Sequence, residues 1–336
     1  MNSKLRIGVI GLGRLGRVYA KYSLGHISNA TLVAVSDVNE KAQRAFADEN
    51  DIAKRYADYG YLLADPEIDA VVIVTPTNTH KDIAIEAARQ GKAVFCEKPL
   101  ALSLDDCQAM KAAIEKGGIF FHLGFMRRFD AGYVAAKRKV EEGAIGKPIV
   151  LKSSSRDPFR PSLEYLDPKN SGGLFTDCGI HDFDLARWFM GEVESVYSIG
   201  GTLVYPEVDE IGDVDNAVTT LQFQSGSLGV IDLSRSGVYG YDIRTEILGT
   251  EGTLQIGYLR ETPVLVLKKN QVSHDTVPYF MERFGQAYEA QLQQFVDRCR
   301  TGQEPTITCD DGLAALRVSL AATQSYKEGR PVRISV

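Results

Sequence analysis

A carboxylate and an imidazole stand four residues apart in the segment GGLFTDCGIHDFD, residues 172–184. If this segment is helical, Asp177 and His181 lie one above the other on one face, and Asp184 extends the same stripe. Imidazole is the side chain best suited to move protons near neutral pH, and the chain has only five histidines. The spacing therefore predicts one wall of a catalytic pocket.

The same stripe allows two other interpretations, which the residues alone leave open. Asp177, His181 and Asp184 could hold a metal ion, but no further cluster of His and Cys supports this, so we expect no metal. His181 could also be an ordinary buried side chain whose ring nitrogens are satisfied by hydrogen bonds.

The bulk composition is that of a folded globular protein. The 336 residues are 44% hydrophobic and 24% charged, and the length favours two domains. The net charge of -6 argues against a nucleic-acid partner, for which a basic surface is expected. The five cysteines form no CxxC pair, and no apolar run is long enough to cross a bilayer. We expect a cytoplasmic protein with no signal peptide, no disulfide framework and no membrane partner.

Short apolar runs alternate with helical patterns over the first third of the chain. This alternation predicts a parallel sheet that helices cover on both faces. The predicted strands are residues 6–10, 31–36, 70–74, 92–96 and 118–123. The predicted helices between them are residues 14–25, 39–49, 79–90 and 103–117.

Beyond about residue 125 the pattern changes to strands rich in Val, Ile, Thr and Tyr, with Gly and Ser turns that favour antiparallel pairing. The predicted strands are 147–156, 193–205, 216–224, 227–235, 241–249 and 252–257, and helices follow at 281–300 and 310–327. The fold class is therefore α/β. We expect a doubly wound domain over residues 1–125 and an α+β domain with an open, mainly antiparallel sheet over residues 126–336.

The sequence GLGRLG follows the first predicted strand and opens the first predicted helix. In such a turn one glycine makes the bend, one lets the backbone approach a pyrophosphate, and one lets helix and strand pack closely. The helix N-terminus offers free N–H groups to the phosphates. The second predicted strand leads to Asp37, whose carboxylate is placed to accept hydrogen bonds from an adenosine ribose. Together these features predict a dinucleotide site rather than an ordinary tight turn.

The residues around this turn favour NAD over NADP. The carboxylate of Asp37 repels a 2′-phosphate and no arginine directly follows it, although Arg14 could reach a phosphate. The loop TPTNTH follows the third predicted strand at the sheet edge where ligands bind. Its His80 is better suited to pack or cap a helix than to catalyse. The predicted cofactor contacts are Gly11, Gly13, Arg14, Leu15, Asp37, Thr75, Asn78, His80 and Glu97.

Glu97, Lys98 and Pro99 follow the fourth predicted strand at the same edge. A lysine held beside a cofactor could donate to a substrate hydroxyl and stabilise the alkoxide as its proton leaves. Glu97 could then bond the nicotinamide ribose. The alternative is a surface ion pair at the strand end, and the local sequence favours neither. The bond between Lys98 and Pro99 could take the cis form.

The motifs GLGRLG, Asp37, TPTNTH, CEKPL and GGLFTDCGIHDFDLARW occur in this order along the chain. Together they resemble the glucose–fructose oxidoreductase, inositol dehydrogenase and rhizopine-catabolism (Gfo/Idh/MocA) family over essentially the whole chain. Within it, SRDP at 155–158 and YGYD at 239–242 are most similar to the inositol 2-dehydrogenases. The resemblance implies an N-terminal Rossmann domain, a C-terminal domain built on an open antiparallel sheet, and NAD(P)-linked oxidation of a ring hydroxyl.

The resemblance also implies roles for single residues. Lys98, Asp177 and His181 match the catalytic lysine, aspartate and histidine of the family. Neutral His181 would take the hydroxyl proton, Lys98 would stabilise the developing oxyanion, and Asp177 would orient the substrate or the histidine. The polyol contacts are expected to be Arg128, Arg156, Asp157 and one of Tyr239 or Tyr241, with Tyr239 preferred.

The leading hypothesis is NAD-dependent oxidation of myo- or scyllo-inositol to the inosose, with hydride transfer to C4 of the nicotinamide. One alternative is an aldose 1-dehydrogenase or other sugar dehydrogenase, which would differ only in its pocket. Another is a non-catalytic NAD-binding sensor or subunit, against which the intact set of Lys98, Asp177 and His181 argues. An exposed sheet face needs cover, so we expect a homo-oligomer, and the resemblance suggests a tetramer.

Overall fold

The computed structural model describes residues 4–334, which pack into two compact units. The first unit holds the described residues up to Met126 together with Gln286–Ala314, and the second holds Arg127–Gly285 and the described residues from Ala315 onward. The boundary between residues 285 and 286 falls inside α11 (Phe280–Thr301), and that between residues 314 and 315 falls inside α12 (Cys309–Glu328). The sequence did not anticipate that residues 286–314 pack with the first unit, and the domain ranges 1–125 and 126–336 stay a prediction.

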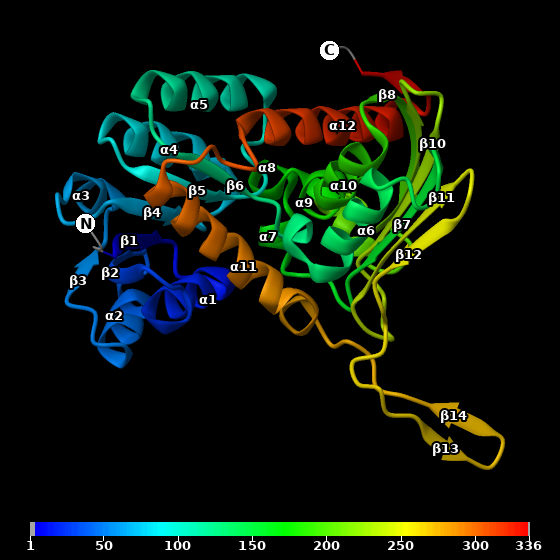
Figure 1. Ribbon diagram of the computed structural model, residues 1–336, viewed down its shortest axis with the longest axis horizontal. Coiled ribbons are helices and arrows are strands. Elements are labelled where there is room, and N and C mark those ends of the chain that lie inside the picture. The colour runs from blue at the N-terminus through cyan, green and yellow to red at the C-terminus, as the bar shows by residue number, and fades with distance from the viewer. Residues whose placement is uncertain (1–3, 335–336) are drawn as a thin grey trace. The chain divides into compact units, whose positions relative to one another are not determined.

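Six parallel strands form the sheet of the first unit, in the order β3-β2-β1-β4-β5-β6 (Figure 1). Their bounds are β1 (Leu5–Ile10), β2 (Ala30–Ser36), β3 (Lys54–Tyr56), β4 (Ala70–Ile73), β5 (Ala93–Glu97) and β6 (Phe121–Gly124). Every residue of β4 and β5 is buried, as expected for strands covered on both faces. The direction of winding reverses between β1 and β4, and ligands of such sheets bind at the carboxyl ends of these strands.

Helices connect the strands of this unit and cover the sheet (Figure 1). They are α1 (Arg14–Lys21), α2 (Glu40–Glu49), α3 (Tyr59–Ala64), α4 (His80–Arg89) and α5 (Leu104–Gly117), and a π-helical turn at Tyr22–His26 continues α1. The side chain of Asn39 caps α2, and that of Ser103 caps α5 by accepting from the Asp106 N–H at 3.1 Å. The predicted parallel sheet is confirmed; β3 and α3 were not predicted.

The second unit is built on a seven-stranded sheet in the order β12-β11-β7-β10-β9-β8-β15. The bounds are β7 (Pro148–Arg156), β8 (Val193–Gly201), β9 (Asn216–Phe223), β10 (Leu228–Ser234), β11 (Asp242–Gly249), β12 (Thr253–Ile256) and β15 (Val332–Arg333). β7 lies between β10 and β11 and pairs parallel with β10, while the other pairs are antiparallel. The prediction of a mainly antiparallel sheet is therefore confirmed, and the parallel pair of β7 and β10 makes the sheet mixed.

Burial alternates along these strands, so the sheet has two different faces. The inner face packs against helices: the Ser153 hydroxyl donates to Asp182 at 2.6 Å, and the Tyr133 and Thr245 hydroxyls lie 2.9 Å apart. The helices of this unit are α6 (Ala131–Glu141), α7 (Leu163–Leu166), α8 (Pro168–Ser171), α9 (Gly173–Asp177) and α10 (Ile180–Met190). We call the opposite side the outer face; its exposed apolar residues are Tyr197, Ile199, Val218, Leu228 and Leu248.

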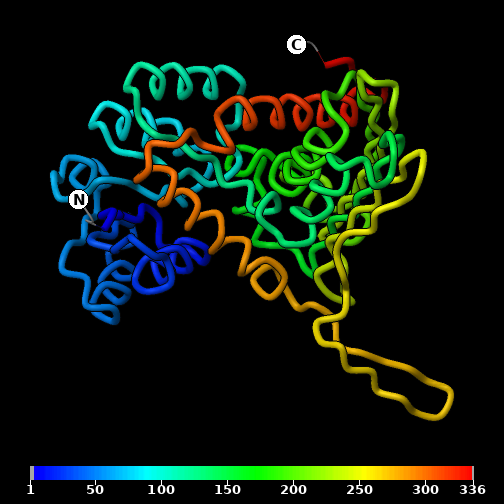
Figure 2. The backbone as a smooth tube through the Cα atoms, viewed as in Figure 1, coloured from blue at the N-terminus to red at the C-terminus, as the bar shows by residue number. Residues whose placement is uncertain are grey.

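A hairpin of β13 (Val266–Lys268) and β14 (Gln271–Ser273) extends from the same unit. Figure 2 shows the chain leaving the end of β12 and returning to the start of α11 as a long loop, here called the arm (residues 258–278). Several of its apolar side chains are exposed, for example Leu267 and Val272. The sequence did not predict the arm.

Candidate active site

The turn after β1 uses its three glycines in three different ways. Gly11 has a φ of +94°, and a Cβ there would lie 2.6 Å from the carbonyl oxygen of Val74. A Cβ on Gly16 would lie 1.9 Å from the carbonyl oxygen of Gly11, so only glycine lets α1 pack this closely. A Cβ on Gly13 would meet nothing within 4 Å, which leaves space for a ligand at the N-terminus of α1. The geometry is that of a dinucleotide-binding turn.

Asp37 directly follows β2 and is bonded to this turn. Its Oδ2 accepts from the backbone N–H of Leu12 at 2.6 Å, and its Oδ1 accepts from that of Asn39 at 2.7 Å. These bonds orient the carboxylate, whose oxygens keep further lone pairs for ribose hydroxyls. At the start of α1, Arg14 is exposed and Leu15 is half-buried. The structure thus brings together the cofactor contacts predicted at the ends of β1 and β2.

His80 ties the loop after β4 to the segment after β5. Its buried ring lies with Nδ1 2.9 Å from the Pro99 carbonyl oxygen and Nε2 3.0 Å from that of Thr75. Burial lowers the pKa of His80, while the two carbonyl contacts act in the opposite direction. The Thr79 hydroxyl is 2.7 Å from that of Thr75, and Asn78 is exposed. The imidazole is therefore a brace between two loops, and contact of this loop with a cofactor stays a prediction.

The Lys98–Pro99 peptide bond is cis, and Lys98 is half-buried. Behind it, the Glu97 carboxyl group is buried and accepts from the Tyr19 hydroxyl and from the Gln291 amide at 3.5 Å. Its Oε2 accepts from the Lys98 backbone N–H at 3.2 Å. Burial raises the pKa of Glu97 to about 7, against the opposing effects of Tyr19 and Lys98. Glu97 therefore holds the backbone of Lys98 in place through this hydrogen bond. Its expected bond to a ribose stays a prediction.

In the second unit, Asp177 is held at both carboxylate oxygens. The Tyr165 hydroxyl donates to Oδ1 at 3.1 Å, and Nη2 of Arg235 donates to Oδ2 at 2.7 Å. The other arm of the same guanidinium lies 3.2 Å from Oδ2 of Asp157. The structure therefore places two predicted residues, Asp157 and Asp177, on one buried arginine.

Arg235 was not among the residues predicted from the sequence. It follows β10, in which Ile231 and Leu233 are buried on the inner face. Side chains alternate along a strand, so position 235 also points inward. A charged residue at an inward position needs a buried partner, and this was the signal that could have identified Arg235.

The helix that was expected to carry Asp177 and His181 is interrupted. α9 ends at Asp177 and α10 begins at Ile180, while the intervening residues keep right-handed helical angles. The N–H groups of residues 178 and 179 both bond to the Leu174 carbonyl oxygen at 3.1 Å, which ends the regular ladder. His181 lies in the first turn of α10 and is 7% exposed. The prediction of one continuous helix is therefore wrong, although both residues stay one turn apart.

Two buried ion pairs join the segment after β6 to α10. Arg128 donates to Asp184 through Nε at 2.9 Å and Nη2 at 2.5 Å. Arg127 donates to Asp182 at 2.8 Å and to the Ser155 hydroxyl at 2.9 Å. A buried guanidinium requires such a carboxylate. Asp184 is thus the partner of Arg128 rather than a free carboxylate of the predicted stripe, and the expected contact of Arg128 with a polyol stays a prediction.

Arg156 and Tyr239 lie on the outer face of the sheet. Arg156 donates to Asp232 through Nε at 2.9 Å and Nη2 at 2.6 Å, and its Nη1 lies 3.0 Å from the Tyr239 hydroxyl. Asp157, the next residue, points to the inner face toward Arg235. Neighbouring residues of a strand project to opposite faces. Within this unit Arg156 and Tyr239 therefore lie on the other side of the sheet from Asp157, and their contact with a polyol stays a prediction.

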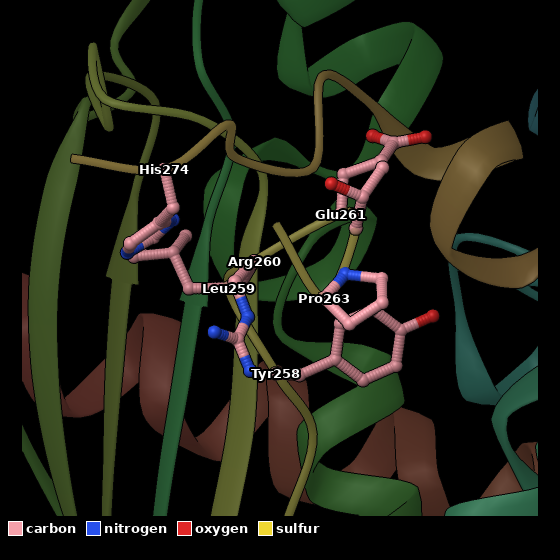
Figure 3. A pocket seen from close by; sticks show the side chains of 7 residues that line it. Tyr258, Leu259, Arg260, Glu261, Pro263 and His274 are labelled. Atoms are coloured by element: carbon pink, nitrogen blue, oxygen red, sulfur yellow. The ribbon is translucent and has the colours of Figure 1, made fainter. Parts of the chain in front are cut away.

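An open hollow of about 570 Å³ lies where the arm begins (Figure 3). Its lining comes from the two segments that form the base of the arm: Tyr258, Leu259, Arg260, Glu261, Thr262, Pro263 and His274. None of these is among the residues predicted for the site.

Within residues 4–334, no group of three or more His, Cys, Asp or Glu is arranged to hold a metal ion. None of the five cysteines, all of which lie within the described residues, forms a disulfide bond. Over the same described range, no helix is both long and apolar enough to span a membrane.

Known proteins resemble this chain over its full length. It is 44% identical over 337 residues to scyllo-inositol 2-dehydrogenase (NAD(+)) of Bacillus subtilis strain 168, covering 100% of this chain and 98% of that protein. It is 44% identical over 333 residues to myo-inositol 2-dehydrogenase of Thermotoga maritima, covering 98% of each. The crystal structure of scyllo-inositol dehydrogenase from Lactobacillus casei, with bound NAD(H) and scyllo-inositol, superposes with a TM-score of 0.94 at 32% identity, covering 99% of this chain and 100% of that one.

Family models match both parts of the chain. Residues 5–125 match the oxidoreductase family model of the NAD-binding Rossmann fold, and residues 137–334 match that of the C-terminal alpha/beta domain. Together they span most of the sequence and confirm the resemblance that its motifs indicated. The chain therefore belongs to the Gfo/Idh/MocA oxidoreductase family.

Proposed function

We propose that this protein oxidises a ring hydroxyl of inositol, either myo- or scyllo-inositol, to the inosose with NAD as hydride acceptor. The observation that carries the proposal is Asp177, a buried carboxylate fixed by Arg235 and Tyr165 one turn before His181. The proposal is supported by full-length relatives that are named scyllo- and myo-inositol 2-dehydrogenases.

The residues of the first unit fit NAD. The turn leaves open space at Gly13, where the backbone can approach a pyrophosphate, and Asp37 sits oriented beside it for a ribose. A negative charge at Asp37 disfavours a 2′-phosphate, which supports NAD over NADP. We assign the adenosine and phosphate end of NAD to Gly11, Gly13, Arg14, Leu15 and Asp37. We assign the rest of the cofactor to Thr75, Asn78, His80 and Glu97. When bound, NAD supplies the hydride acceptor.

We assign three residues to the chemistry. His181, as a neutral imidazole, accepts the proton of the substrate hydroxyl. Lys98 donates a hydrogen bond to the same oxygen and stabilises its developing negative charge. Asp177 raises the basicity of His181 through its own charge or orients the substrate. We further assign Arg128 and Asp157 to polyol binding, since both stand on the helix side of the second unit.

The test is NADH production from a panel of inositol isomers and aldoses under saturating NAD. Turnover of myo- or scyllo-inositol with no comparable turnover of aldoses supports the proposal. Turnover of aldoses alone would instead identify a sugar dehydrogenase of the same family. Tight NADH binding without turnover of any polyol would identify a non-catalytic NAD-binding protein.

We also propose that the protein is a homotetramer. The outer face carries an apolar set that includes Ile199, which is 56% exposed, and the arm exposes Leu267 and Val272 as well. Large exposed apolar patches often mark protein–protein interfaces, and we expect a partner subunit to cover this face. The mass in solution, measured by light scattering, tests this, and a monomeric mass would refute it.

We place the protein in the cytoplasm. The support is that none of the five cysteines forms a disulfide bond, which suits a reducing compartment. Fractionation of cells that produce the protein tests this placement.

A further inference from the structure

The guanidinium of Arg235 is shared between two carboxylates. The residue follows β10, where its N–H bonds to the Asp215 carbonyl oxygen at 2.9 Å, and its side chain is 3% exposed. Nη1 lies 3.2 Å from Oδ2 of Asp157, and Nη2 lies 2.7 Å from Oδ2 of Asp177. The planar guanidinium presents its donors as a rigid fork, so one arginine can fix two acceptors in a defined geometry.

Asp157, Asp177 and Arg235 form a cluster in which the ionisation of the two carboxylates depends on the arginine. Asp157 and Asp177 bring two carboxylates against one guanidinium in a buried place. Burial raises the pKa of Asp157, Arg235 lowers it, and Asp177 raises it again. Two carboxylates that share a site without a cation cannot both ionise, because each charge disfavours the other. Removal of Arg235 would therefore leave one of the two protonated near neutral pH.

The other groups that face the cluster do not replace this cation. The Tyr165 hydroxyl donates to Asp177 at 3.1 Å, and the Cys178 thiol donates to Asp157 at 3.4 Å. Asp213 adds a further carboxylate, whose pKa burial raises, and it accepts from the Leu174 N–H at 3.0 Å. The remaining neighbours are Arg127, which is paired with Asp182 at 2.8 Å, Tyr241, and His181 one turn along.

We propose that Arg235 is a positioning residue for the reaction, which keeps Asp177 ionised and holds its carboxylate in one orientation beside Tyr165. This inference deepens the proposed function and rests on it for the role of Asp177. An ionised Asp177 raises the basicity of His181 and favours transfer of the hydroxyl proton to the ring. A protonated or rotated Asp177 does neither, although it would leave the fold and the cofactor turn intact.

The experiment compares wild type with R235M and D157N/R235M. In R235M we expect kcat to fall about 10²-fold, the size of loss that a misplaced catalytic group produces. Its infrared spectrum at neutral pH should gain one protonated carboxyl relative to wild type. D157N removes the competing charge, and the loss of its polyol contact falls on KM when kcat is measured at saturating inositol. The double variant should therefore lose that carboxyl and regain at least about ten-fold in kcat. If Arg235 served only to stabilise the fold, no such rescue is expected, because a second substitution in the same cluster would only destabilise the protein further.

A second variant and a control complete the test. R235K keeps the charge and loses the fork, so we expect no new protonated carboxyl but a kcat lowered at least about ten-fold. The control is R187M, which breaks a pair with the exposed Glu192 at the end of α10; it should behave as wild type. An unchanged kcat in R235M and R235K, or no recovery in D157N/R235M, would overturn the proposal. The infrared comparison needs no turnover, so it tests Arg235 even if the wild type oxidises no inositol, which would remove only the proposed function.

Discussion

Two glycines of the GLGRLG turn should respond in opposite ways to the same added methyl group. At Gly13 the backbone angles, φ of -63° and ψ of -172°, suit any residue, and a Cβ meets nothing within 4 Å. Gly→Ala at such a position gains about 0.4–1 kcal/mol from the unfolded state, while alanine is a poorer N-cap than glycine by roughly 0.5–1 kcal/mol. Gly13→Ala should therefore leave the free energy of unfolding nearly unchanged. The methyl group fills the space assigned to the pyrophosphate, so the Kd for NADH should rise at least ten-fold.

At Gly16 the effect should fall on stability. The added Cβ would lie 1.9 Å from the Gly11 carbonyl oxygen, a backbone atom that cannot turn away. Overpacking against fixed atoms costs about 3 kcal/mol or more, which corresponds to a drop in Tm of roughly 5–10 °C. Thermal unfolding and a fluorescence titration with NADH, run on both variants, separate the two effects. The reasoning fails if Gly13→Ala binds NADH as wild type does, or if Gly16→Ala melts at the wild-type temperature.

Four further variants test other parts of the structure. Lys98→Ala or His181→Ala should lower kcat about 10²-fold or more with the Kd for NADH within two-fold; an unaltered kcat removes that residue from the mechanism. Because burial raises the folded-state pKa of Glu97 from 4.5 to about 7, the folded protein binds the extra proton in that range, and stability falls as pH rises through it. Urea unfolding should show this loss, up to about 3 kcal/mol, in wild type but not in Glu97→Gln; parallel pH curves would contradict it. Ile199→Asp places a charge on the outer face and should lower the mass seen by light scattering, whereas a tetramer that persists would exclude this face as an interface.

The parts of the fold that bury much apolar surface could be predicted from the sequence, and the exposed parts could not. β4 and β5 are continuous apolar runs that bury every residue, and their predicted positions differ from the structure by one residue or less at each end. β3 has the sequence Lys-Arg-Tyr and lies at the sheet edge, so it has no hydrophobic pattern to detect. The arm is exposed along both strands. Neither element is specified by burial, the main sequence signal of secondary structure.

Ion pairs between residues that lie far apart in the sequence could not be predicted either. The sequence shows Asp184 at helical spacing from His181, but not that Arg128, 56 residues earlier, occupies its carboxylate. Such a pair forms because a buried charge needs a counter-charge, and nothing in the spacing of either motif encodes which one it finds. By contrast, the cofactor turn is local, and its glycines and Asp37 could be assigned from a short stretch of sequence.

Strand alternation carries information about the site that motif matching does not. Arg156 and Asp157 are neighbours in the SRDP motif, and a resemblance to polyol-binding enzymes suggests both as contacts. A pleated strand sends them to opposite faces, and the structure places Arg156 with Asp232 and Asp157 with Arg235. The same rule applied to β10 points Arg235 inward, onto Asp177. Alternation and charge balance thus explain why Arg235 pairs with Asp177 and Arg156 with Asp232, because side-chain direction decides which groups can meet.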